Sequence, residues 1–193
     1  MPDPHTAGVA DDAAPSMKYA VLERERRFLT ARAADLPTAS RVLEIEDRYV
    51  TGTRLRLRTV REPDRGLVRK LGQKVRFAAA DSSALVHTTM YLDEDEYALL
   101  AVLPATTLGK TRHIVPLTDE LDAAVDVFRG ALAGLRIAEV DLGSDGGLPK
   151  PLPAWLGVEI TDVEAFTGHA LAGLDAARLV GLMAAHGCQD AIT

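Results

Sequence analysis

Charged side chains recur two or four residues apart in several segments whose intervening positions are often apolar. Residues 53–60 are the clearest case: in a strand, Arg54, Arg56 and Arg58 would point to one face and Leu55 and Leu57 to the other. The other segments place their charges at Glu23, Glu25 and Arg27, at Lys70 and Lys74, at Lys110 and Arg112, and at Glu139 and Asp141. This pattern favours β-structure with one charged and one apolar face.

The chain as a whole reads as about eight short strands with few helices. Strands are predicted over residues 19–29, 41–50, 53–60, 66–77, 85–92, 110–117, 121–128 and 135–142. A helix is predicted over residues 93–103, where Asp93 can cap its start and Pro104 ends it. Residues 143–153 are predicted as a loop and residues 155–185 as helical. We expect one domain over residues 18–193 after a disordered leader, residues 1–17.

Two arrangements of these strands fit the charge pattern. For a single strand, a charged face is most often the solvated face of a half-buried sheet. Over several strands the apolar faces need cover, and closing the sheet into a barrel with the charges inside is an economical alternative. A charged interior needs an anion for its cations and a cation for its carboxylates. A triphosphate with a divalent metal satisfies both, since Arg and Lys bind phosphate and carboxylates bind Mg²⁺ or Mn²⁺.

Composition excludes several other classes of protein. The single cysteine, Cys188, rules out an intrachain disulfide and a multi-cysteine zinc site. The net charge of −6 weighs against general nucleic-acid binding. No signal peptide or membrane-spanning segment is evident, so we expect a cytoplasmic protein that does not bind membranes.

Taken in order, the charged motifs resemble those of the CYTH superfamily, also called triphosphate tunnel metalloenzymes. The segment Glu23-Arg-Glu25-Arg-Arg27 is similar to the family's opening Glu-x-Glu-x-Lys strand. The later resemblances are Gly52-Thr-Arg-Leu-Arg56-Leu-Arg58, Leu67-Val-Arg-Lys70, Lys110-Thr-Arg112, Val125-Asp126-Val-Phe-Arg-Gly130, Glu139-Val-Asp141 and Trp155-Leu-Gly-Val-Glu159-Ile-Thr161. The resemblance implies an α+β fold, an eight-stranded antiparallel β-barrel with flanking helices that binds a small-molecule triphosphate.

The resemblance also implies roles for individual residues. Carboxylates that would hold one or two Mg²⁺ or Mn²⁺ ions are Glu23, Glu25, Asp126, Glu139 and Asp141. Cations that would bind phosphate are Arg27, Arg54, Arg56, Arg58, Lys70, Lys110 and Arg112. Lys74, His87 and His169 are further possible site residues. Without a metal, Glu23 and Glu25 are expected to repel each other, so that a neutral replacement raises thermal stability.

Two positions depart from the family pattern. Residues 86–90 contain His87 but no carboxylate, where family enzymes carry a metal-directed Glu. His169 stands where the family tends to have a Lys. The predicted function is metal-dependent hydrolysis of inorganic tripolyphosphate or an organic triphosphate. The alternatives are a non-hydrolysing binder of polyphosphate or nucleoside triphosphate, and an adenylate cyclase-like enzyme.

Overall fold

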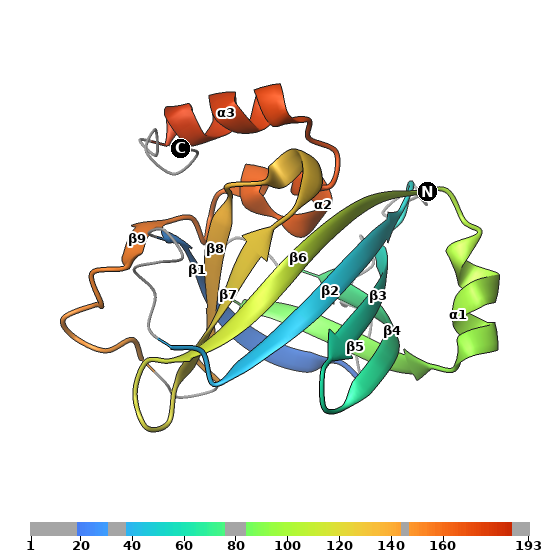
Figure 1. Cartoon of the computed structure of the whole chain (residues 1–193), viewed down its shortest axis with the longest axis horizontal. Helices are drawn as coiled ribbons and strands as arrows, with labels where there is room; N and C mark the ends of the chain where they lie inside the picture. The colour runs from blue at the N-terminus through green and yellow to red at the C-terminus, as the bar shows by residue number, and fades with distance from the viewer. Residues whose placement is uncertain (1–18, 31–37, 76–83, 144–146, 187–193) are drawn as a thin grey trace, which may run out of the picture.

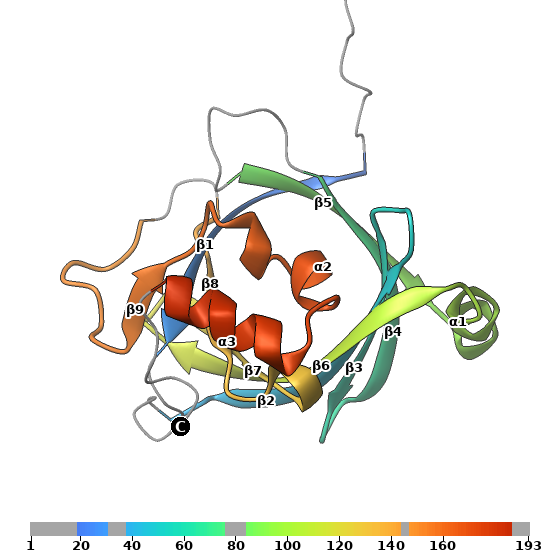
Figure 2. The same cartoon turned by 90° about the horizontal axis from the view of Figure 1, so that it is seen from above.

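Eight antiparallel strands close into a barrel in the computed structural model, which describes residues 19–30, 38–75, 84–143 and 147–186 (Figures 1 and 2). The strands are β1 (Val21–Thr30), β2 (Arg41–Val50), β3 (Leu55–Glu62), β4 (Gly66–Val75), β5 (Ala84–Leu92), β6 (Ala105–Pro116), β7 (Asp122–Phe128) and β8 (Arg136–Asp141). Around the ring they run β1-β5-β4-β3-β2-β6-β7-β8, and β8 pairs back with β1. The predicted barrel of α+β class is confirmed.

Strand pairing places the alternating charges on the inner face of the barrel. Arg58 is directly opposite Asp47 on β2 and Lys70 on β4, so all three side chains share one face. In β3 the apolar alternate positions face outward, and Leu57 among them is buried. This strand contacts α1 (Glu94–Ala101). That helix is the one predicted, and Asp93 caps it by accepting a hydrogen bond from Glu96 N at 2.8 Å.

The segment after β8 differs from its prediction as a continuous helical region. It begins with a ninth strand, β9 (Leu156–Glu159), which pairs with β1 beside the ring. A Cβ at Gly157 would lie 2.9 Å from the carbonyl oxygen of Leu29, so this close approach requires glycine. Short helical elements follow, namely η3 (Glu164–Phe166), α2 (Gly168–Leu171) and α3 (Ala176–Ala185). Residues 156–159 are few and alternate only weakly, so their pattern alone does not predict a strand. They form one because β1 supplies the pairing.

β6 is longer at its start than predicted. It begins at Ala105, where Thr106 and Thr107 extend the pairing with Tyr49 and Arg48 of β2. Two adjacent threonines hide the alternation that identified the rest of the strand. The predicted loop has no helix or strand over its described residues, 143 and 147–153. The predicted leader, residues 1–17, lies outside the described residues, and the extent of the domain stays a prediction.

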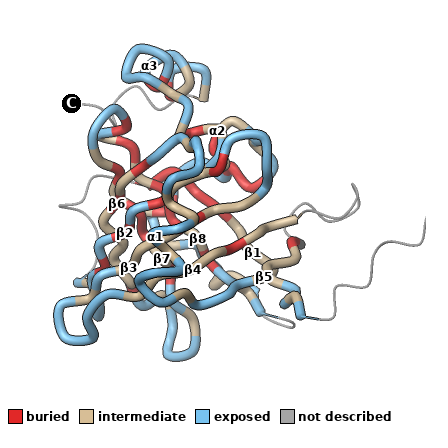
Figure 3. The backbone as a smooth tube through the Cα atoms, turned by 90° about the vertical axis from the view of Figure 1, so that its right-hand side faces the viewer, coloured by how far each residue is buried: buried red, intermediate tan, exposed pale blue. Residues whose placement is uncertain are grey.

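Two apolar clusters stabilise the barrel from different sides. One fills an end of the barrel, where Leu29, Phe128 and Ile137 pack against Phe166, Leu171 and Met183 of the C-terminal segment. The other includes Phe28, Val115, Val125, Val140 and Leu156 and lies on the outer side of the strands. Figures 1 and 2 show α2 and α3 over one end of the ring. Figure 3 shows buried backbone along the strands and exposed backbone at the hairpin loops.

Every helix among the described residues is too short or too polar to span a bilayer.

Candidate functional site: a charged tunnel

The barrel encloses a cavity of about 770 Å³. Most of the residues proposed from the sequence line it: Glu23, Glu25, Arg27, Arg54, Arg56, Arg58, Lys74, His87, Lys110, Arg112, Glu139, Asp141 and His169. Asp126 is instead buried beneath Lys110 and Arg112, and the Lys70 ammonium lies 5.2 Å from the ring centre of Tyr91. The fold therefore gathers the charges of distant segments around one space.

One side of the cavity is basic. We call four cations the basic wall: Arg54 just before β3, Arg56 and Arg58 on β3, and Lys70, which is opposite Arg58 on β4. Its anchor is Asp47 on β2, which is fully buried and accepts hydrogen bonds from Arg58 Nε at 2.6 Å and Arg58 Nη2 at 2.7 Å. Arg56 Nε lies 3.5 Å from the same carboxylate. Burial alone would raise the pKa of Asp47, but the nearby cations, Arg58 foremost, lower it to about 2.

The basic wall holds more positive charge than its carboxylate balances. Burial and the neighbouring charges of Arg58, Arg56 and Arg112 all lower the pKa of Lys70. Arg56 Nε is buried and has no hydrogen-bond partner among the described residues. In the described part of the chain, no ion pair joins Lys70 or Arg54 to a carboxylate. Crowded cations and a buried donor without a hydrogen bond are the features expected of an anion-binding surface.

The next cluster, on β6, β7 and β8, is balanced. Asp126 accepts hydrogen bonds from Lys110 Nζ and, at 2.6 and 2.7 Å, from Arg112 Nε and Nη2. Arg112 also donates to Glu139. Burial lowers the pKa of Lys110, while Asp126 and Glu139 hold the pKa of Arg112 above its usual range against the effect of burial. Asp126, predicted as a metal ligand, is thus a buried counter-ion that orients two cations.

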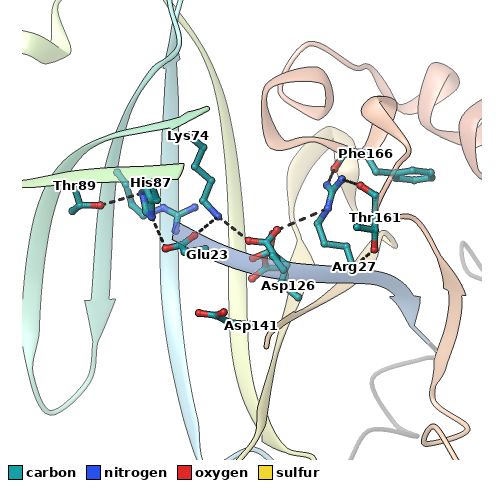
Figure 4. A network of polar contacts seen from close by, with 12 residues as sticks. Glu23, Arg27, Lys74, His87, Thr89, Asp126, Asp141, Thr161 and Phe166 are labelled. Atoms are coloured by element: carbon teal, nitrogen blue, oxygen red, sulfur yellow. Dashed lines mark hydrogen bonds and ion pairs between the residues drawn. The ribbon is translucent and has the colours of Figure 1, made fainter. Parts of the chain in front are cut away.

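The opposite side of the cavity is acidic. We call Glu23 and Glu25 on β1 and Glu139 and Asp141 on β8 the acidic wall; register places Glu25 opposite Asp141 and Arg27 opposite Glu139. Lys74 reaches across from β4 to Glu25 Oε2 at 2.8 Å and Glu23 Oε2 at 3.2 Å (Figure 4). His87 Nδ1 lies 2.8 Å from Glu23 Oε1, and its Nε2 lies 3.0 Å from Thr89 Oγ1.

These contacts overturn one expectation from the sequence. Glu23 and Glu25 are not left to repel each other, because Lys74 contacts both and His87 contacts Glu23. Burial would raise the pKa of Glu23, but the His87 hydrogen bond and the Lys74 charge outweigh it and bring the pKa to about 2. Glu23, Glu25 and Glu139 are thus paired by cationic side chains of the chain itself, whereas the hydrogen bond that Asp141 accepts comes from the Gly143 amide at 3.0 Å.

The donor chemistry of the acidic wall suits a hard divalent cation, but its arrangement does not. Carboxylate oxygens are the ligands Mg²⁺ and Mn²⁺ prefer. Among the described residues, however, no three Asp, Glu, His or Cys side chains converge as a metal site. The Glu23 and Glu25 oxygens face Lys74, and Glu139 accepts from Arg112. As arranged, these residues do not fit the expected ion.

Two further candidate residues lie at the helical end of the cavity. The Arg27 guanidinium donates to the carbonyls of Phe166 and Thr161, both at 3.0 Å, and so ties β1 to the C-terminal segment (Figure 4). The His169 ring meets Tyr49 edge to face, with ring centres 5.7 Å apart. A Cβ at Gly168 would lie 1.9 Å from Tyr49 Oη, so glycine is required beside this contact.

Sequence reasoning missed Asp47 and Tyr49 altogether. Asp47 lies in a run of acidic residues, Glu44, Glu46 and Asp47, of which the first two are exposed. Alternation along β2 could have identified Asp47 as an inward-facing residue, because it lies on the same face as Leu43 and Ile45, which are buried.

Solved structures with this architecture are known. The crystal structure of the inorganic triphosphatase NE1496 matches with a TM-score of 0.51 and 24% identity, covering 79% of this chain and 95% of that one. A second crystal structure of NE1496, described as a hypothetical protein, matches with a TM-score of 0.53 and 24% identity, covering 79% and 99%. The chain therefore shares the closed antiparallel barrel fold of NE1496. No protein-family model matches the sequence. No curated protein matches it either.

Proposed function

We propose that the tunnel binds a small-molecule triphosphate and hydrolyses its terminal phosphoryl group. The substrate would be inorganic tripolyphosphate or an organic triphosphate. The observation that carries the proposal is the positive surplus of the basic wall, where Arg56 Nε is buried without a hydrogen bond and Lys70 is crowded by arginines. The description of NE1496 as an inorganic triphosphatase supports the same reaction class.

The side chains supply electrostatic stabilisation and positioning. Arg56, Arg58 and Lys70 would hold the non-bridging oxygens of the chain of phosphates. Arg112, fixed in direction by Asp126 and Glu139, would meet the charge that develops on the transferred group. Hydrolysis needs a water in line with the scissile bond and little covalent chemistry from the protein, because phosphoryl transfer depends mainly on position and charge.

The finer expectations from the sequence remain proposals. Mg²⁺ or Mn²⁺ stays the expected cofactor of hydrolysis, and a cytoplasmic location stays a prediction. Because the acidic wall does not fit a metal as arranged, metal dependence is tested directly in the assay below.

A non-hydrolysing binder of polyphosphate or nucleoside triphosphate is the second candidate. It is favoured by one observation: the tunnel-facing position on β5 that contacts Glu23 is His87, and not a carboxylate. Such a protein would use the basic wall alone.

Phosphate release and binding separate these candidates. The full chain is incubated with tripolyphosphate, ATP or thiamine triphosphate, each with Mg²⁺, Mn²⁺ or EDTA, and calorimetry measures binding of the same compounds. Release of phosphate from at least one of them is the expected result, with Arg112→Met inactive and exposed Arg65→Met unchanged. Binding without release would establish the second candidate. Absence of both would refute the proposed triphosphate site.

A further inference from the structure

Lys74 lies at the centre of the acidic wall. Its Nζ is 2.8 Å from Glu25 Oε2 and 3.2 Å from Glu23 Oε2 (Figure 4). The side chain comes from β4, which pairs with β5 and not with β1, so it spans the interior to make these contacts. One ammonium group thus joins two carboxylates that the fold holds on a different strand.

A second side chain supports the same arrangement. His87 is the cross-strand neighbour of Lys74, and its Nδ1 lies 2.8 Å from the other oxygen of Glu23. The two Glu23 oxygens are therefore taken up separately, one by Lys74 and one by His87. Thr89 Oγ1, 3.0 Å from His87 Nε2, helps to fix the ring.

An ammonium and a divalent cation cannot share these oxygens. Mg²⁺ requires ligand oxygens at roughly 2.0–2.1 Å in near-octahedral geometry. A positive charge a few ångströms away would oppose its entry, more strongly inside the protein than in water. The lysine side chain is flexible and 34% exposed, so it can swing away when the carboxylates bind something else.

We propose that Lys74 is the resident cation of the acidic wall, which pairs Glu23 and Glu25 in the metal-free chain and competes with divalent metal for them. The inference rests on the proposed function in one respect, the assignment of these carboxylates as the metal-binding side of the tunnel. It predicts that Mn²⁺ binds the wild-type chain weakly and only with displacement of Lys74.

Mn²⁺ binding without any phosphate compound tests the proposal. The full chain is titrated with Mn²⁺, and free Mn²⁺ is followed by electron paramagnetic resonance. Lys74→Met and Lys74→Gln should bind Mn²⁺ at least tenfold more tightly than the wild type, whereas Lys74→Arg should stay weak. Lys150→Met removes the same charge from an exposed position, and should leave Mn²⁺ affinity unchanged.

Equal or weaker Mn²⁺ binding by the neutral variants overturns the proposal, and so does an equal gain in Lys150→Met. Absence of detectable binding in a folded neutral variant also overturns it, because an unpaired acidic wall should take up the ion. Two neutral variants are used so that the decision does not depend on the folding of one. The titration contains no triphosphate, so its result stands whether or not the chain hydrolyses one.

Discussion

The basic wall and the acidic wall manage their charge in different ways. In the basic wall one fully buried carboxylate, Asp47, is shared by Arg56 and Arg58, which leaves cations in excess. In the acidic wall Lys74, His87 and Arg112 come from other strands and pair Glu23, Glu25 and Glu139. One wall is therefore open to an anion from solution, while most carboxylates of the other are already paired by the chain.

The two walls should also differ in the free energy of unfolding that is lost when one partner of an ion pair is removed. A buried ion pair loses several kcal/mol when one partner is removed, because the other charge stays buried. A partly exposed pair is screened by water and contributes far less. The predictions below follow this difference, from the buried anchor of the basic wall to the more exposed bridge of the acidic wall.

Asp47→Asn should give the largest loss of stability. It leaves Arg58 and Arg56 without their carboxylate, and breaking a buried pair in this way costs about 3–5 kcal/mol. Urea denaturation measures the free energy of unfolding. Glu62→Gln, which breaks the surface pair with Arg41, is the control and should lose far less stability. Similar losses in the two variants would abolish the distinction between buried and exposed pairs.

Arg58→Met should weaken tripolyphosphate binding more than tenfold. A hydrogen bond between charged groups contributes roughly 1.5–3 kcal/mol, and Arg58 can offer such bonds to phosphate oxygens. Calorimetry with the full chain gives the dissociation constant, and Arg65→Met at the exposed β3–β4 turn is the matched control. An unchanged dissociation constant would remove Arg58 from the anion site.

Acid should remove the stability that the ionised Asp47 carboxylate contributes. Its pKa falls from 3.8 to about 2 on folding, so its contribution is fully present above pH 3.8 and is lost as the pH falls towards 2. The shift corresponds to roughly 2 kcal/mol. The difference in unfolding free energy between wild type and Asp47→Asn, measured from pH 5 down to pH 2, should shrink over that window. A constant difference would show that the carboxylate charge is not what stabilises the wall.

Glu25→Gln should slightly lower the melting temperature of the metal-free chain. Lys74 loses its nearer partner, and because the lysine is partly exposed the loss is about 1 kcal/mol or less. Thermal unfolding in EDTA measures it, with Glu94→Gln on the exposed start of α1 as control. A rise in melting temperature would instead restore the view that Glu23 and Glu25 repel each other.

The strands could be predicted from the sequence because alternation is a local property, whereas their closure into an eight-stranded barrel was expected from the resemblance to the CYTH superfamily. In β3 the face of each arginine is set by its position in the strand, and the pairing partners do not alter it. The partners themselves are set by long-range register, which is why Asp47 was missed and why Lys74 was placed only as a possible site residue. Arg27 shows the same limit: its motif predicts a phosphate contact, which stays a prediction, but gives no sign of the carbonyl oxygens that the C-terminal segment brings to its guanidinium.

Calorimetric titration of the wild-type chain with tripolyphosphate in EDTA tests the account most directly. The basic wall is open to an anion, while Lys74 keeps Glu23 and Glu25 paired. Tripolyphosphate should therefore bind without any divalent metal, and Arg56→Met should weaken that binding. Binding that appears only when Mg²⁺ or Mn²⁺ is added would contradict the account, because the acidic wall would then need a metal before the tunnel could accept its ligand.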